Sequence, residues 1–289
     1  MDTSDTTNPN GAEAKDQSPA ERARRLKDEG WDMLRLAYGV HRDFYQDAMR
    51  KFREAEAILR AGEDREGLVD VLGGMASALR VTGDRSVMKE AAGYCEEEVE
   101  ILRGLGRENE ALEREVGLLA AYRDLVTLAV EGAVDYLTKG INLGRQRLAQ
   151  AKALGDKSLT AAYCNNLADL SALLATYDAE MAESHLKTAT ALYRQAEDLW
   201  GDGEAEGQAA ARMGLAETYI RLNTNLGAAR ELLEKVQAFY ESAGHRVEYQ
   251  IAQVKSLMAM LYEASGDPDL ARAFREEATA MFRRMGFSS

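Results

Sequence analysis

The sequence predicts an all-α protein, built as a solenoid of about six helical hairpins, and three observations lead to this prediction. The chain has 289 residues but only 3 prolines, and none lies between Pro19 and Pro268. That span is rich in Ala, Leu, Glu and Arg, which favour helices. No alternating run of β-branched residues indicates a strand. A glycine-containing phrase also recurs along the chain at a nearly constant interval.

The recurring phrase ends a helical segment six times, and its last glycine suits the left-handed conformation that follows a helix. The intervals are 44, 49, 46, 43 and 42 residues, between Gly62, Gly106, Gly155, Gly201, Gly244 and Gly286. Four intervals contain a second turn signal near the middle, at residues 82–84, 176–178, 223–225 and 265–267. Each period is therefore expected to form a helix, a tight turn and a second helix.

We expect the solenoid to span residues 18–289, with hairpins at approximately 18–62, 63–106, 107–155, 156–201, 202–244 and 245–286. An irregular helical bundle is the alternative architecture. Residues 1–17 contain one apolar residue larger than alanine, the initiator Met1, so we expect a disordered tail there. Ser18, Pro19 and Glu21 have the pattern of a capping box, which predicts the start of the first helix.

Small and aromatic residues recur at fixed places within the hairpins. They are clearest in the last two hairpins, at Ala216, Tyr219, Ala228, Ala259, Tyr262, Gly266, Ala271 and Ala278. Small residues let paired helices approach closely, and the aromatic ring fills the space between them. These residues resemble the tetratricopeptide repeat (TPR), and the resemblance covers roughly residues 19–286.

The resemblance implies a right-handed superhelix whose first helices line a concave face, and a role in binding a protein or peptide. The period of 42–49 residues is longer than the usual repeat of about 34 residues. It is similar to the extended TPRs of bacterial regulators and scaffold proteins. Gly132, Gly140 and Gly144 make the third hairpin the least regular. A bend, a ligand-facing irregularity or weak packing could each account for them.

The formal net charge of −13 comes from 49 acidic and 36 basic residues. Nucleic acids and anionic membranes favour a basic surface, so we expect neither as a partner. The acidity either serves solubility or matches a basic partner segment. Cys95 and Cys164 lie far apart within helical patterns, which predicts two buried, reduced thiols. No segment has the features of a signal peptide or a membrane span, so we expect a cytoplasmic protein.

No arrangement of side chains indicates catalysis, a metal site or a cofactor, so we expect a protein that is not an enzyme. A second ligand at zinc-binding spacing is missing from all three histidines, His41, His185 and His245. The nucleophile elbow and the phosphate-binding glycine loop are absent as well. The acidic run at residues 96–98 is interpreted as a solvated helix face, with a docking site for a basic partner as the alternative.

The candidate binding residues are polar side chains on the first helices that point away from the hairpin core: Arg80, Asn165, Asp169, Glu217, Arg221 and Glu263. Asn165 and Asp169 are four residues apart and share a helix face, as do Glu217 and Arg221. The alternative is that these are ordinary surface pairs. No convincing set of Lys, Arg and Asn lies on successive first helices, so capture of a free peptide carboxylate is not predicted.

The sequence therefore predicts an interaction module or adaptor that binds a partner protein or peptide segment in the concave groove. The alternative is a regulatory sensor, in which a small peptide or metabolite bound in the solenoid controls an output partner. The last helix, expected at residues 268–285, has an amphipathic pattern. An exposed apolar end would favour a homodimer through this terminal repeat.

Overall fold

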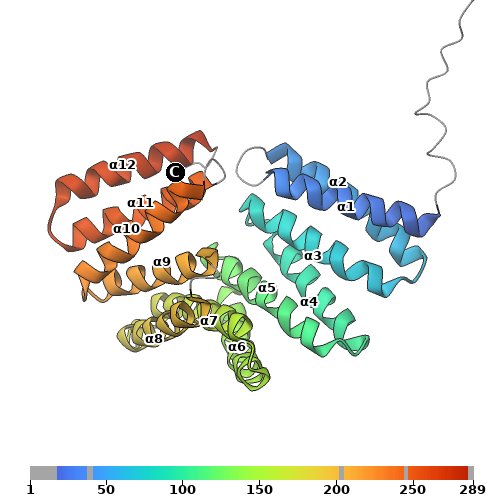
Figure 1. Ribbon diagram of the computed structural model, residues 1–289, viewed down its shortest axis with the longest axis horizontal. Coiled ribbons are helices and arrows are strands. Elements are labelled where there is room, and N and C mark those ends of the chain that lie inside the picture. Colours follow the sequence, from blue (N-terminus) through green and yellow to red (C-terminus); the bar gives the residue numbers. More distant parts are fainter. Residues whose placement is uncertain (1–17, 38–41, 202–204, 244–246, 286–289) are drawn as a thin grey trace, which may run out of the picture.

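The computed structural model describes residues 18–37, 42–201, 205–243 and 247–285, and within these ranges it contains twelve α-helices and no strand (Figure 1). The predicted disordered tail at residues 1–17 lies outside the described residues. The helices are α1 (Pro19–Ala37), α2 (Arg42–Ala61), α3 (Arg65–Thr82), α4 (Met88–Gly104), α5 (Glu108–Thr127), α6 (Ala133–Leu154), α7 (Lys157–Tyr177), α8 (Ala182–Trp200), α9 (Ala205–Arg221), α10 (Leu226–Ala243), α11 (Glu248–Ala264) and α12 (Pro268–Arg284).

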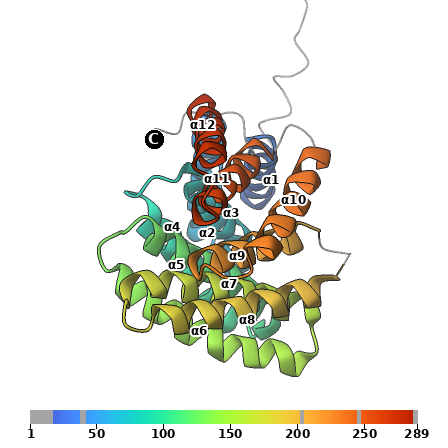
Figure 2. The same ribbon diagram turned by 90° about the vertical axis from the view of Figure 1, so that its left-hand side faces the viewer.

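Consecutive helices pair into hairpins, and the hairpins stack into a curved array whose first and last members lie at the top of the view (Figure 1). Odd-numbered helices contact one another across neighbouring hairpins, as α5 does with α7 and α9 does with α11. They form the inner layer of the array. In the view turned by 90°, α6 and α8 lie outside α7 and α9 (Figure 2). The prediction of an all-α solenoid is confirmed, and the irregular bundle is wrong.

Local capping explains why the helices begin and end where they do. The predicted capping box is present, since the backbone N–H of Glu21 donates to Oγ of Ser18 over 3.3 Å. Gly155 ends α6 with φ of +71°, which glycine adopts without strain. After α2 the left-handed residue is instead Glu63, one position beyond the predicted Gly62. The predicted terminal glycines Gly244 and Gly286 lie outside the described residues.

Three of the described helices begin with a carboxylate that accepts a backbone N–H, at Asp64, Asp156 and Asp267.

Glycine lets the helices of the first two hairpins close around an aromatic ring. Phe52 of α2 is completely buried between Gly30 of α1 and Gly74 of α3. A Cβ added at Gly30 or Gly74 would lie 2.7 or 2.4 Å from the ring. Trp31 meets the same ring edge-on, with the ring centroids 5.8 Å apart. This is the small-plus-aromatic packing that the sequence predicted, found here in the N-terminal half as well.

The third hairpin is regular, in contrast to the irregularity that its glycines suggested. Its second helix, α6, runs without interruption from Ala133 to Leu154. A Cβ at Gly140 would lie 2.9 Å from a methyl group of Leu170, and one at Gly144 would lie 2.7 Å from Leu167. Both leucines belong to α7, so the two glycines, one turn apart, provide the close approach of α6 to α7. Tight packing, and neither a bend nor weak packing, explains their presence.

The last helix closes the array with a polar outer face. Phe274 of α12 stacks on Tyr262 of α11 with centroids 5.4 Å apart, and Phe282 meets Tyr249 at 5.7 Å. These rings turn the apolar side of α12 toward α11. Its outer side is charged, and Leu270 is the one large apolar side chain exposed on the described part of this helix. Within the described part of α12, the exposed apolar surface on which the homodimer prediction depended is therefore small, and that prediction stays untested.

Candidate functional site

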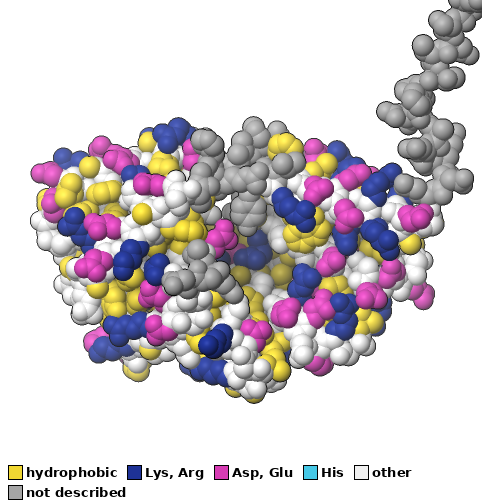
Figure 3. Space-filling model, viewed as in Figure 1, with side chains coloured by type: hydrophobic (Ala, Val, Ile, Leu, Met, Phe, Trp, Pro, Cys, Tyr) yellow, Lys and Arg dark blue, Asp and Glu magenta, His cyan; other side chains and the backbone are white. Residues whose placement is uncertain are grey.

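A row of paired charges crosses the inner layer of the solenoid from α3 to α9. We call it the concave strip, defined by Arg80, Asp124, Arg123, Asp169, Glu217 and Arg221. Nε of Arg80 on α3 donates to Oδ2 of Asp124 on α5 over 2.8 Å. Nη1 of Arg123, also on α5, donates to Oδ2 of Asp169 on α7 over 2.9 Å. The space-filling view shows a central hollow in which basic and acidic side chains are visible (Figure 3).

The repeat period places these partners opposite one another. Arg80 and Asp124 are 44 residues apart, and Arg123 and Asp169 are 46 residues apart. The first separation equals the 44 residues between Gly62 and Gly106, and the second is close to the 49 residues between Gly106 and Gly155. Side chains at equivalent positions of neighbouring hairpins therefore meet across the inner layer. Arg123 also pairs with its neighbour Asp124 over 2.9 Å, which joins the two contacts into one continuous row.

Asp169 is held from a second direction by α8. The hydroxyl of Tyr193 donates to Oδ1 of Asp169 over 2.5 Å. Burial of the Tyr193 ring and the neighbouring Asp169 charge raise the pKa of this hydroxyl well above its ordinary value, so it stays a donor at neutral pH. Both oxygens of Asp169 are thus engaged within the chain. The side chain helps to build the wall of the groove.

Glu217 and Arg221 continue the strip on α9. Their charged atoms are 3.5 Å apart, and Nη1 of Arg221 also donates to the carbonyl of Ala172 on α7 over 3.0 Å. The Glu217 side chain is 41% exposed. Partial burial raises the pKa of Glu217, Arg221 opposes the rise, and the like charge of Asp169 adds to it. Glu217 is therefore the carboxylate of the strip that is most open to a partner cation.

The other two candidate residues differ from the strip in their surroundings. Asn165 is 9% exposed, and its Oδ1 is buried without a hydrogen-bond donor among the described residues. Glu263 on α11 is open to solvent and pairs with Arg275 of α12 over 2.5 Å. The structure thus brings together four of the predicted residues, namely Arg80, Asp169, Glu217 and Arg221. Asn165 lies one turn from Asp169, and Glu263 is turned toward the last helix.

Sequence reasoning missed four members or neighbours of the site: Arg123, Asp124, Tyr193 and Tyr249. The repeat register could have indicated Asp124, because it lies one period of 44 residues after Arg80, and Arg123 is its neighbour in sequence. Tyr249, at the start of α11, could not be found in this way. Burial raises its pKa, the charge of Asp124 adds to the rise, and Arg123 opposes it. The charges of α5 therefore reach the start of α11.

The acidic run on α4 is a solvated face at Glu96 and Glu97, as the sequence suggested, but not at Glu98. Glu96 accepts a hydrogen bond from the hydroxyl of Tyr122 over 2.6 Å. Glu97 is bound by both terminal nitrogens of Arg60, at 2.8 and 2.9 Å. Glu98 is only 4% exposed. Glu96 and Glu97 therefore have partners within the fold while remaining accessible, and Glu98 is buried.

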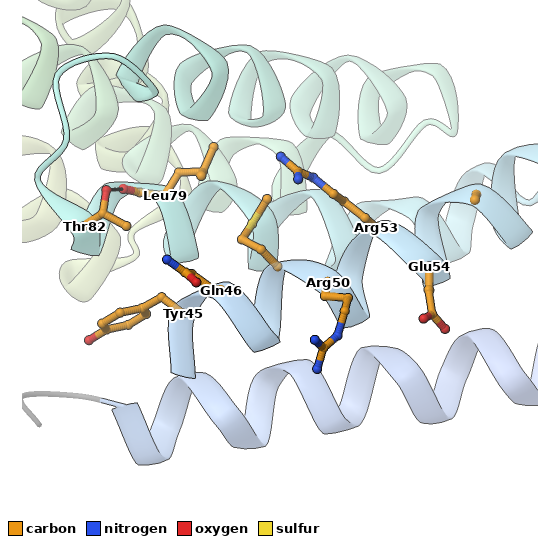
Figure 4. A pocket seen from close by; sticks show the side chains of 9 residues that line it. Tyr45, Gln46, Arg50, Arg53, Glu54, Leu79 and Thr82 are labelled. Atoms are coloured by element: carbon orange, nitrogen blue, oxygen red, sulfur yellow. Dashed lines mark hydrogen bonds between the residues drawn. The ribbon is translucent and has the colours of Figure 1, made fainter. Parts of the chain in front are cut away.

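A shallow trough of about 620 Å³ runs along α2 beside the C-terminal part of α3 (Figure 4). Tyr45, Met49 and Leu79 are mostly buried and form its apolar floor. Arg50 and Arg53 lie along the same helix and are exposed. Small-molecule sites are usually concave pockets that bury most of the ligand. This trough is open to solvent along its length, so it would leave most of a small molecule exposed.

The described ranges contain neither a cluster of metal-binding side chains nor a helix suited to span a membrane. No three His, Cys, Asp or Glu side chains there come together in a way that could hold a metal ion. His185 pairs with Asp178 over 3.0 Å at the turn between α7 and α8, whereas His41 and His245 lie outside the described residues. Among the helices that the structure defines, none is both long enough and apolar enough to cross a membrane.

Comparison with known proteins places the fold. No family model and no curated protein matches the sequence. Among solved structures, BtubC (BKLC) from P. vanneervenii matches 95% of this chain and 94% of its own, with a TM-score of 0.53 and 16% identity. A Podospora anserina protein described as a putative kinesin light chain with nearly identical TPR-like repeats covers 74% of this chain and 94% of its own. Its TM-score is 0.47 and its identity 20%. In its fold the chain is a TPR-like helical-repeat protein, and BtubC shares this fold over almost the whole of both chains.

Proposed function

We propose that the protein is a cytoplasmic, non-catalytic scaffold that binds a segment of a partner protein in its concave groove. The observation that carries the proposal is the concave strip, which spans the four inner helices α3, α5, α7 and α9. Ion pairs join α3 to α5 and α5 to α7, and a hydrogen bond from Arg221 to the carbonyl of Ala172 joins α9 to α7. Stacked hairpins of this kind create extended concave surfaces suited to long segments. A row of polar groups along such a surface offers a partner a defined register.

The strip and the neighbouring helix α11 present two kinds of side chain. Arg80, Arg123 and Asp169 bind groups within the chain and so hold the wall in place. Glu217 and Tyr249 are each 41% exposed and can meet a partner directly. Met260 is 40% exposed and follows Tyr249 by eleven residues, three turns along the same face of α11. Acidic and apolar contacts together suit a partner segment that carries a basic and an apolar side chain.

The proposal is tested by affinity capture with two charge-reversed variants. Glu217→Lys changes the exposed carboxylate of the groove. Glu231→Lys makes the same change on α10, an outer helix, where Glu231 is exposed. Circular dichroism first establishes that both variants fold. We expect a partner that the unmodified protein and Glu231→Lys retain, and that Glu217→Lys loses. Equal retention by both variants would contradict a site in the groove, and loss with Glu231→Lys alone would place it outside.

The sensor hypothesis makes a different prediction for the same protein. A small ligand that binds the folded state at 100 times its Kd would stabilise it by about 2.7 kcal/mol and raise the thermal midpoint. An adaptor that binds a long protein segment would show no such rise with metabolites. The concave strip favours the adaptor, since its exposed groups are spread along the array and do not converge on one enclosed pocket.

A further inference from the structure

Glu98 is a carboxyl group buried at the junction of the second and third hairpins. It lies on α4 and is 4% exposed. Its Oε1 occupies space that only a glycine leaves open, because a Cβ at Gly73 of α3 would lie 2.8 Å from this oxygen. The same oxygen has no well-formed hydrogen bond among the described residues. The three helices α3, α4 and α5 thus enclose an ionisable group whose charged form they stabilise poorly.

The charges around this carboxyl group are insufficient to hold it ionised. Nη1 of Arg114 on α5 is 3.3 Å from Oε1 of Glu98. Arg114 is shared, since its Nη2 also donates to Asp70 of α3 over 3.1 Å. Lys27 of α1 reaches Asp70 and not Glu98, over 3.2 Å. Glu110 of α5 adds a further negative charge nearby. The shared guanidinium of Arg114 therefore favours the charged form of Glu98, whereas two neighbouring carboxylates and burial disfavour it.

We infer that Glu98 is a proton-sensitive latch between the second and third hairpins: its neutral form lets α3, α4 and α5 close on one another, and its ionisation loosens this junction. The inference goes beyond the proposed binding function. It concerns the same array, however, because α5 also carries Arg123 and Asp124 of the concave strip. A proton taken up at Glu98 therefore acts on the helix at the centre of the groove.

The direction of the effect follows from the pKa of the group. Burial, the first cause, together with Asp70 and Glu110, raises the pKa of Glu98 to about 7, with Arg114 opposing. In an opened junction the group regains its ordinary value of 4.5. The closed junction then binds the proton more tightly than the open one, and its advantage is lost as the pH rises from 4.5 through 7. Between pH 5.5 and 8 the opening equilibrium should change on the order of 30-fold.

Hydrogen–deuterium exchange of peptides from α4 and α5 tests the latch, with rates corrected for the intrinsic pH dependence of exchange. In the unmodified protein we expect protection to fall on the order of 30-fold from pH 5.5 to pH 8. Glu98→Gln, which cannot ionise, should keep its protection at both pH values. Glu97→Gln, the matched change at the neighbouring carboxylate, should behave like the unmodified protein. Constant protection in the unmodified protein, or an unchanged fall in Glu98→Gln, would overturn the inference.

A second measurement needs no variant and keeps the test decisive if Glu98→Gln does not fold. The carboxyl ¹³C shift of Glu98 is followed by nuclear magnetic resonance from pH 4 to pH 9 in the unmodified chain. A titration midpoint near 7 supports the latch. A midpoint near 4.5, the ordinary value, would show that the folded junction does not disfavour the charge, and the inference would be wrong.

Discussion

Substitution of Gly74 by alanine tests the packing that joins the first two hairpins. The added methyl group would lie 2.4 Å from Cζ of Phe52, well inside the ordinary carbon–carbon contact of about 3.5–4.0 Å. The ring cannot move away freely, because Gly30 of α1 lies against the same ring. Overpacking of this kind costs about 1–3 kcal/mol. The better helix propensity of alanine returns about 0.5–1 kcal/mol, so we expect Gly74→Ala to lose about 1–2 kcal/mol of stability.

Gly93 provides a matched control for the same chemical change. It lies in the middle of α4, is exposed, and an added Cβ would meet nothing within 4 Å. Gly93→Ala should therefore stabilise the protein by about 0.5–1 kcal/mol. The assay is urea unfolding followed by helical circular dichroism, with the three proteins compared under one set of conditions. Relief of the clash by Phe52→Leu in the Gly74→Ala background should give a total loss smaller than the sum of the single losses.

We expect the free energy of unfolding to fall in Gly74→Ala and to rise in Gly93→Ala, so that the two variants differ by about 2 kcal/mol. The reasoning would be refuted if Gly74→Ala were as stable as Gly93→Ala. It would also be refuted if the losses from Gly74→Ala and Phe52→Leu simply added. Either result would mean that the ring of Phe52 is not clamped between α1 and α3.

Two further predictions concern buried groups in the middle of the array. Tyr163→Phe removes the hydroxyl that donates to the carbonyl of Leu112 over 2.6 Å, so chemical unfolding should show a loss of about 1–2 kcal/mol; an unchanged midpoint would mean that this bond between α5 and α7 contributes nothing. Burial raises the pKa of Cys95 to about 12 and that of Cys164 to about 11, so both thiols should stay protonated at pH 8 and react with a thiol reagent only after unfolding. Rapid labelling of either thiol in the native protein would contradict their burial.

The regular spacing of turn signals made the fold predictable. Proline is absent from the long central span, and glycines such as Gly106 and Gly155 mark helix ends with positive φ. The sequence could not show which face of a helix each small residue occupies. Gly140 and Gly144 therefore suggested an irregular hairpin, although each lies tightly against a leucine of α7. Glycine destabilises an isolated helix but allows a neighbouring helix to pack closely against it. The net effect depends on whether such a neighbouring helix is present, which the sequence of one helix does not show.

The candidate site was predicted in part, for a similar reason. Arg80 and Asp169 were identified by their place on first helices, but their partners come from the neighbouring hairpin and depend on the exact stacking offset. Glu98 was misread as a surface residue because acidic residues surround it in sequence. Its position three residues after the buried Cys95 and four before the buried Leu102 puts it on the apolar stripe of α4. That periodicity was the available signal for its burial.

The central claim, that a partner lies in the concave groove, is tested most directly by site-specific photo-crosslinking. A photoreactive benzoylphenylalanine replaces Glu217 in one protein and Glu231 in another, and each is illuminated in the native lysate. The account predicts a light-dependent adduct from position 217, on the same protein that the capture experiment retains, and none from position 231. An adduct from position 231 without one from position 217 would contradict the claim and move the binding surface to the outside of the solenoid.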